Sequence, residues 1–146
     1  MAFCIHNTIT DEKAELEGVW MPYEGGSRVK LARFNNETAQ RMRIEWYQEN
    51  KTLLESLAEK NTEKAEEQRT ELFKAGESEI MSKAVLLDWE GFEDENGKEV
   101  KYSQKTAEQY LTLSRDFRKD MTTMSGNRDQ YLLKNLQKDV EDAKKS

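Results

Sequence analysis

Side chains that could act as metal ligands or nucleophiles are rare in this chain of 146 residues. Its single histidine, His6, stands two positions after its single cysteine, Cys4. Such a pair supplies at most half of the ligands of a structural zinc site. Nucleophilic catalysis needs a base beside an activated Ser or Cys, whereas residues 1–13 lack periodicity and predict a loose lead-in with a short strand near Phe3 to Ile9. We therefore expect no metal site and no cofactor.

The other residues that could bind a metal ion or act in catalysis form an acidic segment, residues 88–99, which contains six acids and one lysine. An EF-hand calcium loop with its glycine at Gly97 would need acids at its first and last positions, which here are Phe92 and Ser103. Paired carboxylates for glycoside hydrolysis need a pocket that keeps one of them protonated, and this stretch is the most polar of the chain. The run is interpreted as a solvated turn.

The remaining chemical and binding classes are disfavoured by composition. Gly25-Gly26 lacks the further glycines and the lysine of a phosphate-binding loop, so no enzyme is expected. The net charge is −6, and the lysines and arginines are scattered among acids, which argues against nucleic-acid binding. The sequence contains no apolar run of about 18 residues, so we expect no membrane-spanning helix. A lone cysteine and a non-basic N-terminus predict a cytoplasmic protein.

The elements that would position these residues predict a mainly α (α+β) fold in a single domain, residues 1–146. Residues 14–87 would form a β-hairpin and a long helical part, and residues 88–146 a second small hairpin and two C-terminal helices. Apolar and charged residues each make up 36% of the chain, so we expect a modest core.

The first hairpin is predicted around Gly25-Gly26, which suit the positive φ angles of a two-residue turn. This register places Trp20 opposite Leu31 and Pro22 opposite Val29. Because Pro22 cannot donate a ladder hydrogen bond, its strand should lie at an edge of the sheet.

The central part predicts long helices. Asn36 before Glu37 is a helix start, and an apolar stripe follows at Ala39, Met42, Trp46, Leu53 and Leu57. Residues 59–71 are almost entirely polar, which indicates either a solvated helix or a mobile linker. A second stripe is formed by Phe73, Ile80, Ala84 and Leu87, and it is expected to run into Trp89.

The second hairpin can be formed with a two-residue or a three-residue loop. Only the three-residue loop, residues 95–97, pairs Phe92 with Val100 and puts the apolar side chains on one face. Ser103 should cap the next helix, which Gly126 interrupts. A last amphipathic helix is expected over residues 129–143.

The tryptophans Trp20, Trp46 and Trp89 are interpreted as core anchors, with an exposed groove for a partner helix as the alternative. Together with Phe92 and Tyr102, they are the candidate partner-binding residues.

Residues 87–111 resemble the signature segment of the tail assembly chaperones of long-tailed bacteriophages. The shared features are Trp89-Glu90-Gly91, an acidic stretch with Asn96-Gly97, and a helix start at Tyr102-Ser103 with an Ala and a Leu further on. Residues 18–36 also resemble the family's opening strand pair, which leads into an Asn-capped helix. The similarity covers most of residues 18–132.

The resemblance implies a helical, self-associating, non-virion protein of the host cytoplasm that binds the tape measure protein during tail tube assembly. The tail tube protein is a second candidate partner, and a homo-oligomer is expected. The matching residues Trp89, Gly91, Gly97 and Tyr102 are interpreted as structural first and partner-contacting second. Lys144-Lys145 predict either a ribosomal slip site for a longer product or a charged C-terminus that suits the helix dipole. The alternatives are a structural virion or head–tail adaptor protein and, third, an unrecognised enzyme.

Overall fold

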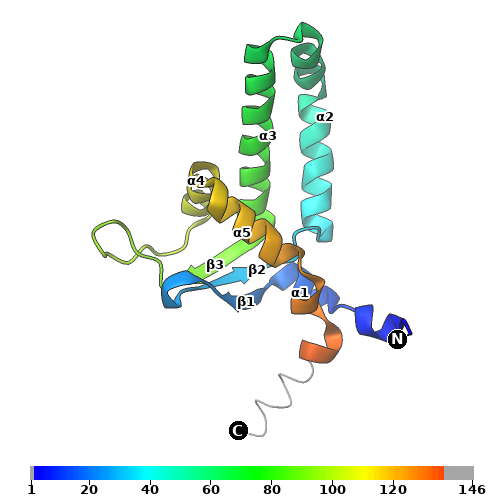
Figure 1. Cartoon of the computed structure of the whole chain (residues 1–146), viewed down its shortest axis with the longest axis vertical. Helices are drawn as coiled ribbons and strands as arrows, with labels where there is room; N and C mark the ends of the chain where they lie inside the picture. Colours follow the sequence, from blue (N-terminus) through cyan, green and yellow to red (C-terminus); the bar gives the residue numbers. More distant parts are fainter. Residues whose placement is uncertain (1, 137–146) are drawn as a thin grey trace, which may run out of the picture.

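The computed structural model describes residues 2–136, in which a helical hairpin rises from a small sheet (Figure 1). The mainly α fold is confirmed, and none of the helices within these residues has the length and apolar character to cross a membrane. The elements are α1 (Glu12–Glu17), β1 (Val19–Pro22), β2 (Arg28–Leu31), α2 (Glu37–Lys60), α3 (Glu63–Ala84), β3 (Leu86–Glu90), α4 (Gln104–Leu113) and α5 (Arg115–Gly126), with 3₁₀ turns at Ile5–Thr8, Glu24–Gly26 and Arg128–Tyr131.

The first hairpin forms, but its expected register was wrong by one residue. Trp20 pairs with Lys30 and Pro22 with Arg28. The reason is a three-residue loop, Glu24–Gly26, closed by a hydrogen bond from the Tyr23 N–H to the Ser27 carbonyl (2.8 Å). An odd loop length reverses which side chains face the core. Pro22 does lie on an edge strand, because the strand order is β1-β2-β3.

The third strand corrects the expectation that the α3 stripe continues to Trp89. The helix ends at Ala84, whose carbonyl accepts a hydrogen bond from the Asn36 amide (2.9 Å). The chain then pairs antiparallel with β2, and Val29 lies opposite Trp89. The periodicity of a short apolar segment fits a helix and a strand equally well. Pairing with β2 therefore determines that this segment is a strand.

Helices α2 and α3 form an antiparallel hairpin with a tight turn (Figure 1). Asn36 caps α2 as expected, accepting from the Ala39 N–H (3.0 Å). Asn61, with a left-handed φ of 47°, ends α2, and Thr62 caps α3. Residues 63–71 are helical with mostly exposed charged side chains, as in the solvated-helix interpretation, but they belong to a new helix that runs back along α2.

The second hairpin has the three-residue loop. The Val100 N–H donates to the Phe92 carbonyl (2.8 Å), and the Asp94 N–H donates to the Lys98 carbonyl (2.8 Å). Gly97 has a φ of 78°, which is the left-handed position of this loop.

The C-terminal part differs from expectation in one respect. Ser103 caps α4, but the predicted single helix to Gly126 is two helices, because Ser114 ends α4 and its side chain caps α5 at the Phe117 N–H (3.1 Å). The lead-in contains a 3₁₀ turn in place of the expected strand, and Thr10 forms a bridge to Leu132. Of the last expected helix, residues 129–131 belong to a 3₁₀ turn and residues 133–136 are helical, while residues 137–143 and the Lys144-Lys145 pair lie outside the described residues.

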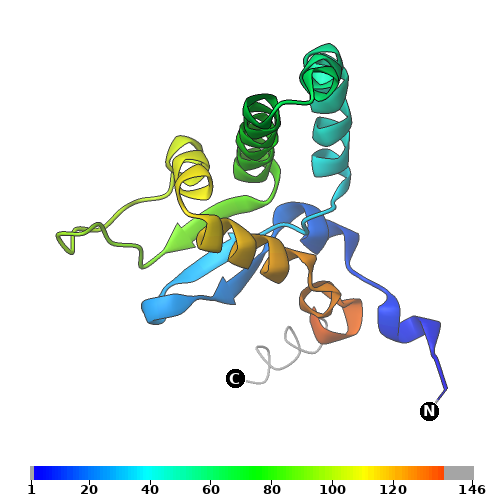
Figure 2. The same cartoon turned by 45° about the horizontal axis from the view of Figure 1, so that its top comes forward.

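The core lies between one face of the sheet and helices α3, α4 and α5 (Figure 2). Tyr131 closes it, since its hydroxyl donates to the Leu31 carbonyl (2.9 Å) across 100 positions of sequence. Its buried members from these elements include Met21, Val29, Leu31, Ile80, Met81, Ala84, Leu86, Trp89, Ala107, Leu111 and Met121.

Candidate partner-binding surfaces

Trp89 is the centre of an aromatic cluster at the junction of β3, the second hairpin and α4. It is only 3% exposed. Its ring is stacked on Phe92 (4.5 Å between centroids) and on Tyr110 (5.5 Å), and it meets Tyr102 edge-on (5.0 Å). Its indole N–H donates to the Val100 carbonyl (2.8 Å). This geometry gives Trp89 a packing role and leaves little of it accessible to a partner.

Two of the other matching residues, Tyr102 and Gly91, belong to the same junction, whereas Gly97 lies in the loop of the second hairpin. The Tyr102 hydroxyl donates to the Leu86 carbonyl (2.8 Å), and burial raises the pKa of Tyr102. Gly91 has a φ of 79°, and a Cβ at this position would lie 3.1 Å from the Ser27 Cα. A side chain here would therefore push the junction away from the first hairpin.

The two remaining candidate residues lie apart from this cluster and from each other. Trp20 is on the sheet face opposite Met21, by strand alternation, with the Arg28 guanidinium 4.1 Å from its ring centroid. Trp46 lies between α2 and α3 and contacts Phe73 (5.3 Å between centroids). The structure thus brings together three of the five predicted residues, Trp89, Phe92 and Tyr102.

An open surface that the sequence analysis missed lies at the N-terminal end. A hollow of about 490 Å³ is lined by Ile5, Ile9 and Leu16 from the lead-in and α1, and by the start of α2. Ile5 is 67% exposed, and Ile9 and Leu16 are also exposed. Three acids line it as well, of which Glu15 is paired with Arg33 (3.5 Å), whereas Glu12 and Glu37 form no ion pair among the described residues. We call this site the N-terminal hollow. Its apolar residues, Ile5, Ile9 and Leu16, are separated by mostly polar residues in the sequence, so no local pattern identified it.

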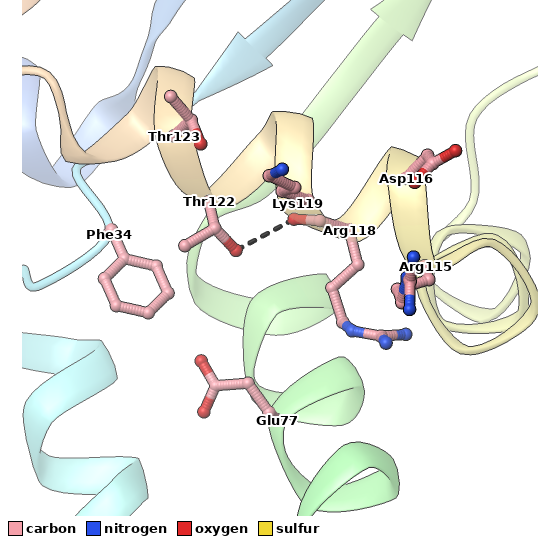
Figure 3. A pocket seen from close by; sticks show the side chains of 8 residues that line it. All are labelled: Phe34, Glu77, Arg115, Asp116, Arg118, Lys119, Thr122 and Thr123. Carbon is pink, nitrogen blue, oxygen red and sulfur yellow. Dashed lines mark hydrogen bonds between the residues drawn. The ribbon is translucent and has the colours of Figure 1, made fainter.

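A second hollow, of about 480 Å³, lies between α3 and α5, and we call it the basic hollow (Figure 3). Arg118 extends from α5 toward α3, Glu77 points into the space from α3, and Asp116 points away. The lining residues are Phe34, Glu77, Arg115, Asp116, Arg118, Lys119, Thr122 and Thr123.

The charge of the basic hollow is dominated by its cations. Glu77 is neutralised by Arg43, whose Nη2 lies 2.8 Å from its Oε1. Within residues 2–136, the ion pairs include neither Arg115, Arg118 nor Lys119. The basic residues were expected to be scattered, but the spacing i, i+3, i+4 of these three would have placed them on one helix face.

The sequence analysis considered Cys4, His6 and the acidic segment 88–99 as candidates for metal binding or catalysis. Cys4 and His6 are both exposed. Among the described residues, no group of three or more His, Cys, Asp or Glu side chains could hold a metal ion.

A comparison with protein families places most of the chain in one of them. The sequence model of a family described as YdaY prophage protein matches residues 28–142. No curated protein and no solved structure matches the chain. The match spans most of the chain and includes β2, both long helices, β3, α4 and α5.

Proposed function

The chain belongs to the YdaY prophage protein family and is thus phage-derived, and we propose that it acts as a tail assembly chaperone. In this role it binds the tape measure protein in the host cytoplasm, keeps it in solution while the tail tube assembles, and is left out of the virion. The resemblance of residues 87–111 to the signature segment of such chaperones supports this role. Those residues build the aromatic junction at which β3, the second hairpin and α4 meet.

The observation that carries the proposal is the N-terminal hollow. In a chain with 36% charged residues, large apolar side chains remain exposed around an open depression. Exposed apolar surface of this kind, with a polar border, is typical of protein-binding sites. The hollow would accept the apolar face of an amphipathic helix, and Glu12 and Glu37 would favour basic residues beside that face.

The strength of this contact suits a chaperone. Covering one apolar side chain contributes about 1.5–3 kcal/mol, and association must first offset several kcal/mol of lost rotational and translational freedom. A site with only Ile5, Ile9 and Leu16 therefore binds weakly and reversibly. A long client with many amphipathic helical turns would bind many copies of the chain, one at each N-terminal hollow. Because each contact is weak, the client could still be released as the tail tube assembles around it.

The test is co-expression with the tape measure protein of the same phage, followed by measurement of the client fraction that stays in the supernatant. The variant Ile5→Ser/Leu16→Ser should lose client solubilisation with an unchanged melting temperature, because both side chains are exposed. Leu113→Ser is the matched control, since Leu113 is 84% exposed on a distant helix. A wild-type protein that leaves the client insoluble would contradict the chaperone role. If the Ile5→Ser/Leu16→Ser variant still keeps the client in the supernatant and only the Leu113→Ser variant does not, the chaperone role stands and the N-terminal hollow is the wrong site.

Purified phage particles separate this proposal from the alternative, a structural virion or head–tail adaptor protein. A chaperone should be absent from their mass spectra. A stoichiometric amount of this chain in the particle would favour the structural role.

A further inference from the structure

We propose that copies of this chain bind one another head to tail, with the second hairpin of one copy inserted in the basic hollow of the next. This inference goes beyond the proposed function and does not depend on a client. It rests on two charged features that form no ion pair among residues 2–136, on their shapes, and on their separation in the fold.

The receptor is the basic hollow. Arg115, Arg118 and Lys119 are the cations of its α5 side, and within residues 2–136 none of them has a carboxylate within ion-pairing distance. The Arg118 side chain is held in place by a hydrogen bond from Nη1 to the Leu111 carbonyl (2.5 Å). Phe34 and Thr122 add an apolar wall, so the hollow suits an extended acidic segment with some apolar character.

The occupant is the second hairpin, residues 92–100. Glu93, Glu95 and Glu99 are exposed, and they too are absent from the ion pairs of the described residues. The loop is ordered by Asp94, whose carboxylate accepts from the backbone N–H groups of Asn96 and Lys98 (2.9 Å each). A preformed loop loses little conformational freedom on binding, which favours the contact.

A hairpin cannot fill the hollow of its own chain. Its base is fixed where Phe92 stacks on Trp89, and its tip projects away from the body in both views (Figures 1 and 2). The basic hollow lies on the α3 side of α5 (Figure 3). The complementary surfaces must therefore come from two copies. Because the two surfaces differ, the contact repeats and produces a ring or an open chain of subunits.

The experiment is sedimentation velocity of the purified protein, without client, over a range of concentrations at low ionic strength. The wild-type protein should show a mass that rises with concentration and falls when salt is added, because exposed charges are screened beyond about 10 Å at 0.1 M salt. Glu93→Lys/Glu95→Lys and, separately, Arg115→Glu/Lys119→Glu should each weaken self-association at least tenfold. Glu55→Lys/Glu59→Lys, on the exposed face of α2, is the control for a change of net charge and should associate like wild type.

Mixing the two variants gives the decisive result. The lysine hairpin of one variant complements the acidic hollow of the other, so the mixture should associate although each variant alone does not. A wild-type protein that stays monomeric, an equal loss in the control, or a mixture that stays monomeric would each overturn the proposal. None of these outcomes bears on whether the monomer holds the tape measure protein in solution, so the two proposals fail separately.

Discussion

The indole of Trp46 in α2 lies directly against Gly76 of α3, and no side chain fits between them. A Cβ built on Gly76 would overlap the Cε2 and Nε1 atoms of Trp46. Gly76 is buried in the helix interior, where glycine is normally unfavourable. Its presence is explained by the close approach of the two helices at this ring.

Gly76→Ala should therefore lower the free energy of unfolding by about 1–3 kcal/mol, the usual cost of overpacking. This loss would appear although alanine is a better helix former than glycine by roughly 1 kcal/mol. In a Trp46→Ala background the same substitution should be neutral or stabilising. Denaturant unfolding of the four proteins measures the coupling, and strictly additive effects would show that the ring does not restrict position 76.

Trp89→Ala should cost on the order of 3–5 kcal/mol, because it removes a buried indole from three aromatic neighbours. Trp89→Phe should cost less, since an aromatic ring remains, although the hydrogen bond to the Val100 carbonyl and part of the buried ring volume are lost. Trp20→Ala, on the other face of the sheet, is the matched control and should give a smaller loss in thermal melts. If Trp89→Ala leaves the melting temperature unchanged but abolishes client binding, Trp89 is a contact residue and not a core anchor.

Gly97→Ala should destabilise by about 1–2 kcal/mol, because its φ of 78° is costly for a residue with a Cβ. The space around Gly97 is open within the described residues, so no clash contributes. Gly126→Ala is a direct comparison, since Gly126 also has open space but lacks a positive φ. It should be neutral or slightly stabilising in the same chemical unfolding series. Equal effects at both positions would mean that backbone conformation does not explain Gly97.

The tyrosines predict a loss of stability at alkaline pH. Burial, and for Tyr23 also a hydrogen bond to Asp120 (2.7 Å), raises the pKa of Tyr23 and of Tyr131. The folded state thus keeps these protons more tightly than the unfolded state, whose tyrosines ionise near pH 10. Their contribution is fully present below about pH 10 and is lost as the pH rises toward the folded-state pKa. Tyr23→Phe should weaken this pH dependence, measured by unfolding at several pH values, and an unchanged profile would exclude Tyr23 as a source.

The local elements were readable from the sequence because their signals are carried by neighbouring residues. Asn36 and Ser103 were identified as helix caps, since a cap needs only its own side chain and the next turn. The loop of the second hairpin was identified by a register argument in which Gly97 and the pairing of Phe92 with Val100 agree. The mainly α fold follows from the long stripes of α2 and α3.

Only the tertiary structure decided the features that depend on distant pairing. β3 was interpreted as helix because Val29, its partner opposite Trp89, is 60 positions away in sequence and invisible to local periodicity. The odd loop at Glu24–Gly26 set the opposite register for Trp20. The two hollows also arise from packing: the fold places Glu77 of α3 against the basic face of α5, and the lead-in beside the start of α2. The sequence alone determines the two long helices, α2 and α3, whereas pairing and burial against distant segments determine where α3 ends, which short segments become strands and which surface remains open.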